Sequence, residues 1–307
     1  MPDQHSTLSG KALILVMRAL GALPLSLRRF LGRVGGTLFA KLPTRERRIA
    51  ALQYECVFGE RPSQRFLADV FSHIGMQSLE AMGLTPFTRD DTSLVQCNDW
   101  QYIHEVLNSN RGLVALTAHT GNWDLVGAYM VSRGIPVTTV ARPGRSPAVH
   151  QALAYMRSRY GIDTIWRTGP ASARTILKVL AQRGVVAALI DQDTDVASTM
   201  IPFFGLPAST PSGIVDLAHR TGAAVCSVFS RRRADGSYLI SVTPFDDSLS
   251  EEQVLKEFNT RLEDWIRIDP AQWVWFHKRW RTLQNGERLS TKRYLERLRM
   301  RPHGGEL

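Results

Sequence analysis

Short apolar runs alternate with longer segments of helical spacing through the middle of the chain. The runs are rich in Val, Leu, Ile and Ala and are bounded by glycine or polar residues, as buried strands are. Strands are predicted at 113–118, 135–141, 162–166 and 184–190, and helices at 100–108, 122–132, 146–160 and 171–182. This alternation indicates βαβ units and a largely parallel sheet flanked by helices.

The pattern changes after residue 220. Two strands predicted at 223–230 and 238–243 flank Asp235-Gly236, a strong hairpin signal, so we expect an antiparallel edge on the sheet. An amphipathic helix is predicted at 250–268, and 273–276 is a last short apolar element. The predicted fold class is α/β, with a largely parallel, mixed sheet.

The N-terminal part of the chain is helical in pattern. Residues 45–82 predict two helices with a break at Gly59 and Pro62. In segment 8–31, Arg18 and Pro24 interrupt the apolar sequence, whereas a spanning helix needs about 20 mostly apolar residues. No signal-peptide cleavage site is convincing.

We therefore interpret segment 8–31 as an interfacial, membrane-associating helix. The side chains expected to meet lipid phosphates are Lys11, Arg18, Arg28 and Arg29. The alternatives are a helix packed on the protein's own core and a tilted single span.

The composition narrows the class of protein. Hydrophobic residues make up 44% of the 307 residues, enough to build a large core and to argue against a disordered chain. Glycine and proline show no period, which excludes a collagen-like chain. Cys56, Cys97 and Cys226 are widely separated, so neither a disulfide scaffold nor a cysteine zinc site is expected.

The formal net charge of +10 implies an anionic partner. We find no helix-turn-helix, zinc-finger or RNA-binding signature, so nucleic acid is not expected. One basic cluster follows the apolar N-terminal segment, which favours an anionic membrane surface. The alternative is a solvated basic face.

Residues 117–124 (Thr-Ala-His-Thr-Gly-Asn-Trp-Asp) carry the candidate chemistry. They lie between a predicted strand and a predicted helix, where open α/β sheets place their sites. A turn at Gly121 would let the Asp124 carboxylate accept from one nitrogen of His119 and leave the other free to take a proton. The first N–H groups of the helix would favour an oxyanion or a phosphate.

No nucleophile accompanies this pair, because there is no G-x-S-x-G elbow and no cysteine near His119. The pair would therefore activate a hydroxyl of the substrate for direct attack on an activated acyl group. A metal site would need more ligands than His119 and Asp124, so none is expected. Taken alone, H-x-x-x-x-D is a weak pattern, and a structural histidine is the alternative.

Further motifs make the pattern specific. His119-Thr-Gly-Asn-Trp-Asp124 resembles the H-x-x-x-x-[DE] block of the glycerolipid acyltransferase superfamily, and its Gly-Asn-Trp filling resembles the lipid A biosynthesis late acyltransferases. Other blocks of that family follow in order as far as Arg281. They are Val140-Ala-Arg142-Pro, Asp191-Gln192-Asp193, the segment from Ile201 to Thr210, and the segment from Trp273 to Trp280.

The resemblance implies an O-acyltransferase that moves a fatty acyl chain from acyl carrier protein, or acyl-CoA, to a hydroxyl of a lipid A precursor, with no cofactor. His119 would be the general base and Asp124 would fix its tautomer, while Asn122 assists the thioester oxyanion. The alternatives are another glycolipid acceptor, a catalytically silent lipid-binding protein, and a hydrolase that activates water.

Several other residues become candidates through the resemblance. Arg142 and Arg174 would contact a phosphate or headgroup, with surface ion pairs as the alternative. Asp191 and Asp193 would orient an arginine or the motif, with helix capping or loop solvation as the alternative. Phe203 and Phe204 would line an acyl channel or form an ordinary packed loop.

The resemblance also implies a place in the cell and a division of the chain. We expect a peripheral or single-pass protein at the cytoplasmic face of the bacterial inner membrane, with acidic acyl carrier protein and an anionic glycolipid attracted by its basic charge. The predicted parts are a membrane-associating segment (1–44), an acyltransferase α/β domain (45–285) and a basic tail (286–307).

Overall fold

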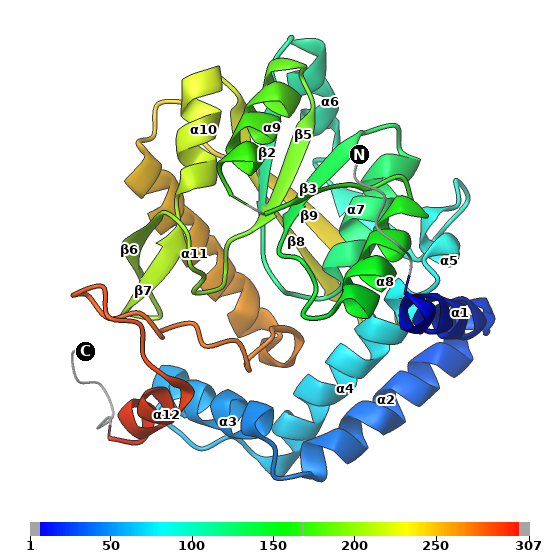
Figure 1. Cartoon of the computed structure of the whole chain (residues 1–307), viewed down its shortest axis with the longest axis vertical. Coiled ribbons are helices and arrows are strands. Elements are labelled where there is room, and N and C mark those ends of the chain that lie inside the picture. The colour runs from blue at the N-terminus through cyan, green and yellow to red at the C-terminus, as the bar shows by residue number, and fades with distance from the viewer. Residues whose placement is uncertain (1–6, 168, 301–307) are drawn as a thin grey trace.

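A seven-stranded sheet lies at the centre of the computed structural model, which describes residues 7–167 and 169–300 (Figure 1). The strand order is β1-β9-β8-β2-β5-β3-β4; β8 and β9 are antiparallel, and the other neighbouring pairs are parallel. The strands are β1 (Val95–Asn98), β2 (Leu113–Thr117), β3 (Val137–Ala141), β4 (Asp163–Trp166), β5 (Val185–Leu189), β8 (Ala224–Arg232) and β9 (Tyr238–Pro244).

β2 is the central strand. All five of its residues are buried, and it pairs with β5 on one side and β8 on the other. A strand covered on both faces needs a continuous apolar run rather than alternation, which explains the sequence Leu-Val-Ala-Leu-Thr.

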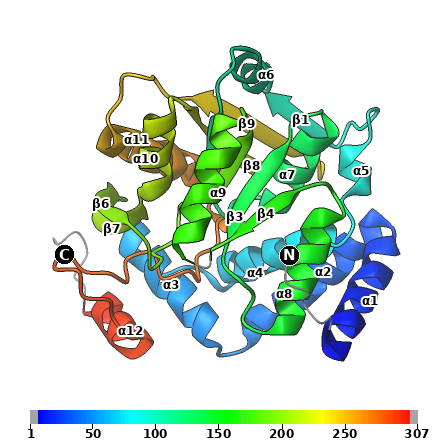
Figure 2. The same ribbon diagram turned by 45° about the horizontal axis from the view of Figure 1, so that its top comes forward.

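Helices cover both faces of the sheet (Figure 2). α9, α10 and α11 pack on one face within the larger apolar core, and α6 and α7 pack on the other. The helices of these two layers are α6 (Gln101–Asn108), α7 (Trp123–Ser132), α9 (Pro170–Ala181), α10 (Gly213–Thr221) and α11 (Glu251–Ile268). α8 (Pro147–Ser158), the short α5 (Thr85–Thr88) and a 3-10 turn, Pro270–Gln272, complete this part.

The predicted α/β class is confirmed, and every strand and helix predicted between residues 100 and 268 is present with ends within two residues. Several elements, α5 among them, are not predicted from the sequence. β1 adds an edge strand, β6 (Ser198–Phe203) and β7 (Leu206–Pro211) form a separate antiparallel pair, and α12 (Thr291–Arg299) replaces part of the predicted tail.

α12 forms because Tyr294 and Leu298 pack into the larger core. Residues 1–6 and 301–307 of the predicted terminal segments lie outside the described residues.

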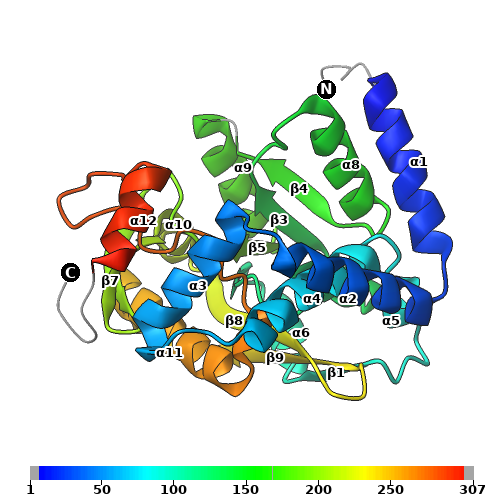
Figure 3. The same ribbon diagram turned by 90° about the horizontal axis from the view of Figure 1, so that it is seen from below.

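The N-terminal segment is a bent pair of helices, α1 (Leu8–Ala22) and α2 (Leu25–Lys41), with an angle of 117° between them. α1 lies beside α8, and α2 lies beside α4 (Gln64–Ala81), which follows α3 (Arg45–Phe58) (Figure 3). Within the described part of the chain, no single helix is long and apolar enough to cross a membrane. The bent pair passes that test by length and composition only.

α2 has two stripes of four-residue spacing. Arg28, Gly32, Gly36 and Ala40 are buried. Phe30, Val34 and Leu38 lie on the other side and are 62%, 40% and 56% exposed. The helix therefore packs on the protein's own core and also presents an apolar surface.

Arg28 and Arg29 are not the lipid-facing side chains that the sequence predicts. Arg28 is 1% exposed and donates to the backbone oxygens of Leu23, Glu80 and Gly83. Arg29 forms an ion pair with Glu80 at 2.6 Å. Both guanidiniums hold α2 against the C-terminal end of α4, where unpaired carbonyl groups favour a cation.

The backbones of α2 and α4 pack directly against each other at glycine positions. A Cβ atom at Gly36 would lie 2.1 Å from the backbone oxygen of Phe71, and one at Gly32 would lie 2.5 Å from that of Gly75. No side chain fits between the helices at these positions.

Gly36→Ala is expected to lower the free energy of unfolding by about 1–3 kcal/mol, because the added methyl group overpacks the α2–α4 contact. Gly35→Ala is the matched control, because its added Cβ has no atom within 4 Å. The control should be neutral or stabilising by up to about 1 kcal/mol. Denaturant unfolding measures both, and equal values for the two variants would contradict the close approach.

Candidate active site

The register of two parallel strands brings His119 and Asp191 together. Thr117, the last residue of β2, lies opposite Leu189, the last residue of β5. Two residues beyond these strand ends lie His119 and Asp191. His119 Nδ1 lies 2.7 Å from Asp191 Oδ1, and the backbone N–H of His119 donates to Asp191 Oδ2 at 2.9 Å.

Asp191 is a fully buried carboxylate with three donors. Besides His119, the indole of Trp273 donates to it at 3.0 Å. Burial raises the pKa of Asp191, but the imidazole of His119 and the hydrogen bonds lower it more, so the pKa lies well below its ordinary value. The ionised carboxylate can hold Nδ1–H of His119 and leave Nε2 for proton transfer.

Asp124 does not form the predicted hydrogen bond with His119. It belongs to the first turn of α7, and its oxygens lie 3.7 Å from Arg157 Nε and 3.5 Å from Gln77 Nε2. Burial raises the pKa of Asp124, and the charges of Arg157 and His119 oppose this. The helix turns Asp124 toward Arg157 of α8, and the carboxylate that the sheet register delivers to His119 is Asp191.

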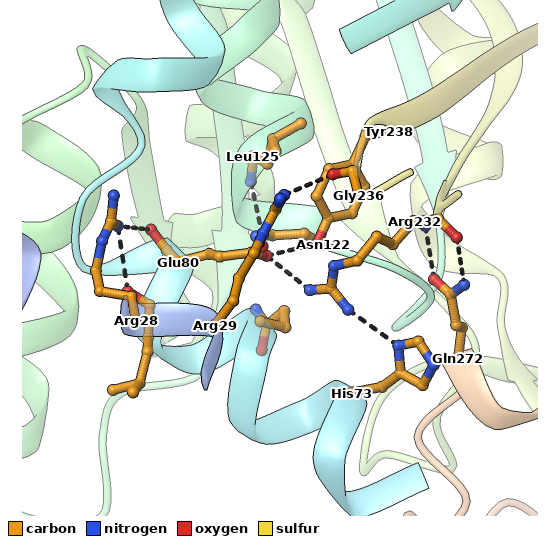
Figure 4. A network of polar contacts seen from close by, with 12 residues as sticks. Arg28, Arg29, His73, Glu80, Asn122, Leu125, Arg232, Gly236, Tyr238 and Gln272 are labelled. Carbon is orange, nitrogen blue, oxygen red and sulfur yellow. Dashed lines mark hydrogen bonds and ion pairs between the residues drawn. The ribbon is translucent and has the colours of Figure 1, made fainter. Parts of the chain in front are cut away.

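The Asn122 side chain is not placed to contact the thioester oxyanion, contrary to its predicted role. It is buried; Oδ1 accepts from the Leu125 N–H at 3.0 Å, and Nδ2 donates to Glu80 at 3.4 Å (Figure 4). Asn122 is thus the N-cap of α7. The backbone at the start of α7 is what remains of the predicted oxyanion donors.

The loop around His119 is held by the segment that begins at Trp273. Thr120 and Trp273 form an antiparallel bridge, and the Val274 N–H donates to the His119 oxygen at 3.2 Å. Gly121 has φ +55°, and a Cβ there would lie 2.3 Å from the Ser230 oxygen. Only glycine fits this turn without strain.

His277 and Gln192 complete the surroundings of His119, although the sequence motifs do not single them out as site residues. The rings of His119 and His277 have centroids 4.7 Å apart. Gln192 Nε2 lies 2.6 Å from His277 Nδ1 and 3.0 Å from His119 Nε2. Burial, and then the nearby His119, lower the pKa of His277 to about 3, so it is neutral and can accept from the amide.

A pocket of about 650 Å³ opens beside His119. Its polar lining includes Gln192 and four arginines, and the remaining wall is largely apolar. The arginines are Arg142, Arg157, Arg167 and Arg220, and the apolar residues include Val140, Leu153, Ile176, Ile190, Ile214 and Leu217. A smaller cavity of about 50 Å³ adjoins it at Arg157 and Leu189 and runs along apolar residues of β2 and α7.

The structure separates the other predicted site residues. Arg142 lines the pocket, whereas Arg174 is exposed on α9 outside its lining. Asp193 accepts from the Thr282 hydroxyl at 2.9 Å and lies 3.6 Å from Arg288, so it fixes the C-terminal segment. Phe203 of β6 packs against Trp273 and Trp280, which lie outside the β6–β7 pair. This supports the alternative that its segment is an ordinary packed loop.

Arg142 and Arg167 are two like charges on one pocket wall. Burial, and then the charge of Arg142, lower the pKa of Arg167. In residues 7–167 and 169–300, neither guanidinium has a carboxylate within 4.0 Å. Such a pair favours an anionic ligand. Among the same residues, no three His, Cys, Asp or Glu side chains are grouped closely enough to hold a metal ion.

The fold and the site define an α/β protein with a histidine–carboxylate pair at the carboxyl ends of its central strands, beside a cationic and apolar pocket. In sequence, residues 6–282 match the bacterial lipid A biosynthesis acyltransferase family. The chain belongs to this family, and the resemblance of its motifs is confirmed.

Relatives in this comparison are about one-quarter identical. The lipid A biosynthesis palmitoleoyltransferase of Escherichia coli is 26% identical over 86% of this chain and 88% of the relative. The lauroyltransferase of the same organism is 26% identical over 82% and 84%. A phosphatidylinositol mannoside acyltransferase of Mycolicibacterium smegmatis is 26% identical over 59% of this chain, which spans 61% of the relative's length.

The sequence places Asp191 directly after a predicted strand, but spacing in the sequence does not favour it over Asp124 as the partner of His119. Asp124 lies in the first turn of the predicted helix that follows His119, whereas Asp191 follows a predicted strand and is 72 residues away in the sequence. The order of β2 and β5 in the sheet decides between them, and that order is not a local property.

Asp191→Asn should alter the stability of the protein in acid. Because the folded-state pKa of Asp191 is lowered, its ionisation stabilises the fold above the ordinary value of about 4, and this contribution is lost as the pH falls through the lowered pKa. The variant should therefore be less stable at pH 7, and the difference from the parent should shrink toward pH 2.

Urea unfolding between pH 7 and pH 2 measures this difference, with exposed Asp91→Asn as the control. A difference that stays constant across this range would show that Asp191 is not held in the ionised form.

Proposed function

We propose that this protein transfers a fatty acyl chain from a thioester donor, acyl carrier protein or acyl-CoA, to a hydroxyl of a lipid A precursor. The observation that carries the proposal is the His119–Asp191 pair at the wall of a pocket that is cationic on one side and apolar on the other. The family supports acyl transfer in lipid A biosynthesis.

In the proposed reaction, Nε2 of His119 takes the proton of the acceptor hydroxyl. The hydroxyl oxygen attacks the thioester carbon, and the carbonyl oxygen becomes an oxyanion. The C–S bond then breaks, and the thiolate takes the proton from the imidazolium. Asp191 stabilises the imidazolium and fixes the ring orientation throughout.

Arg157 is placed to stabilise the oxyanion. It lines both the large pocket and the smaller cavity, and its Nη1 has no hydrogen-bond partner within the described residues. Such a preorganised donor acts where negative charge develops. Asp124, 3.7 Å from Arg157 Nε, would hold this guanidinium, which gives the second residue of the motif an indirect role.

Arg142 and Arg167 would bind a phosphate, from the donor's carrier arm or from the acceptor headgroup. The apolar side of the pocket and the adjoining cavity would receive the acyl chain. The basic net charge would attract acidic acyl carrier protein and the anionic glycolipid.

His119→Ala should lower the rate of acyl transfer about 10²–10⁴-fold, because the general base is removed. The assay uses acyl carrier protein thioester or acyl-CoA with a tetraacyl lipid A precursor, and circular dichroism checks the fold. Exposed His219→Ala is the matched control and should keep the parent rate.

Full transfer by His119→Ala would refute the mechanism. Release of free fatty acid without an acceptor would instead identify the hydrolase alternative. If the parent protein shows neither transfer nor hydrolysis, a catalytically silent lipid-binding protein is supported. Transfer only to a mannoside-type glycolipid would show that the acceptor is not a lipid A precursor.

Membrane association at the cytoplasmic face of the inner membrane is part of the proposal. The surface that supports it is the exposed stripe of Phe30, Val34 and Leu38 on α2. An amphipathic surface of this kind inserts its apolar side chains at the headgroup boundary. Removing the residues before Arg33 would also break the α2–α4 packing, so point substitutions are the cleaner test.

Phe30→Ser with Leu38→Ser should lower partitioning onto phosphatidylglycerol vesicles at least tenfold, because burial of each large apolar side chain contributes about 1.5–3 kcal/mol. Sedimentation with vesicles measures this. Ile268→Ser, which removes a 59% exposed apolar residue on α11, should leave partitioning unchanged. Unchanged partitioning of the double variant would exclude this stripe as the membrane surface.

A further inference from the structure

Glu80 of α4 is a buried carboxylate with four side-chain partners from four parts of the chain (Figure 4). Its Oε1 accepts from Arg29 Nε at 2.6 Å. Its Oε2 accepts from Arg232 at 2.7 Å, from the Tyr238 hydroxyl at 2.5 Å and from Asn122 Nδ2 at 3.4 Å. No residue of this network lines the large pocket.

Two routes lead from Glu80 to the loop that carries His119. The direct route is Asn122, whose other side-chain atom caps the first turn of α7, where Asp124 lies. The second route runs through Arg232, whose backbone exchanges two hydrogen bonds of 2.7 Å with the Gln272 amide. The backbone oxygen of Gln272 in turn accepts from the Gly121 N–H at 3.2 Å.

A third connection runs from Glu80 to the apolar N-terminal helix. Arg29 of α2 bridges Glu80 and the Gly236 oxygen of the β8–β9 turn, each at 2.6 Å. Arg29 is the residue before Phe30, which belongs to the exposed stripe. The same carboxylate therefore contacts the exposed helix and the catalytic loop.

Stability alone does not account well for such a site. A buried ion pair is expensive to desolvate, and apolar replacements of similar volume are often neutral or stabilising. Burial raises the pKa of Glu80, but Arg232 and Arg29 lower it more, so the group is ionised. What the four contacts supply is a fixed geometry, and acyl transfer is sensitive to it, since a shift of 1 Å in a catalytic group can lower a rate about 100-fold.

We propose that Glu80 is a positioning residue for acyl transfer: through Asn122 and Arg232 it fixes the loop from His119 to Asp124, and through Arg29 it ties that loop to α2. This inference rests on the proposed function, because the loop matters through its reaction.

Exchanging donor and acceptor between positions 80 and 122 tests the direct route. Asn122→Ser keeps a side-chain cap for α7 but loses the contact with Glu80. Its kcat should fall about 10–100-fold with KM and the melting temperature little changed. Asn122→Asp places two carboxylates side by side, and it should lower kcat further than Asn122→Ser does.

The double variant Glu80→Gln with Asn122→Asp restores one donor and one acceptor at the same net charge, and it should recover much of the lost kcat. Normal kcat in Asn122→Ser, or no recovery in the double variant when it is folded, would overturn the proposal.

A second readout separates this inference from the proposed reaction. Amide hydrogen exchange of Gly121 and Leu125 reports the order of the loop in any assay buffer, with no substrate present. Faster exchange in Asn122→Ser with active parent protein supports the inference. Unchanged exchange contradicts it. Faster exchange with a parent protein that shows no transfer refutes the proposed function and leaves the positioning of the loop supported.

The link to α2 is tested by Arg29→Gln against Arg65→Gln, an equal change of charge at a 93% exposed residue of α4. Arg29→Gln should lower kcat and speed exchange at Gly121, whereas Arg65→Gln should change neither. Equal behaviour of the two variants would remove α2 from the network.

Discussion

The in-register pairing of β2 with β5 is the constraint on which the rest of the site depends. It aligns the ends of the two strands, so that the side chains of the residues two positions beyond them meet at 2.7 Å. Trp273 and the bridge at Thr120 then hold the carboxylate and the loop from the other side. A slip of the register by one residue would turn Asp191 away from His119.

Two buried carboxylates, Asp191 and Glu80, lie close to the loop that carries the candidate base. Asp191 contacts His119 directly, and Glu80 lies one step further away, behind Asn122. Both carboxylates have depressed pKa values because their donors outweigh the effect of burial. Arg279, fully buried, plays the same part for the β6–β7 pair by donating to Ser209 and Thr210. Polar contacts thus specify the geometry inside an otherwise apolar fold.

α2 combines two features that the sequence interpretation treated as alternatives, packing on the protein's own core and an exposed apolar surface. On α2, one stripe is shaped by glycines and two arginines for close packing on α4, and the opposite stripe leaves aromatic and aliphatic side chains in solvent. The spacing of four residues allows both, because it keeps each set on its own side of the helix. Arg28 and Arg29 serve this packing.

By itself, the sequence determined the alternating strands and helices from residue 100 to residue 190, because buried parallel strands and amphipathic helices have distinct apolar periods. It also determined the position of His119 at a strand end. Its motifs also identified the family over most of the chain. The tertiary structure alone decided that Asp191 and not Asp124 meets His119, that Asn122 is a buried cap, and that α12 and β1 join the fold. Those outcomes depend on which distant segments become neighbours, and local spacing carries no information about the energy of such contacts.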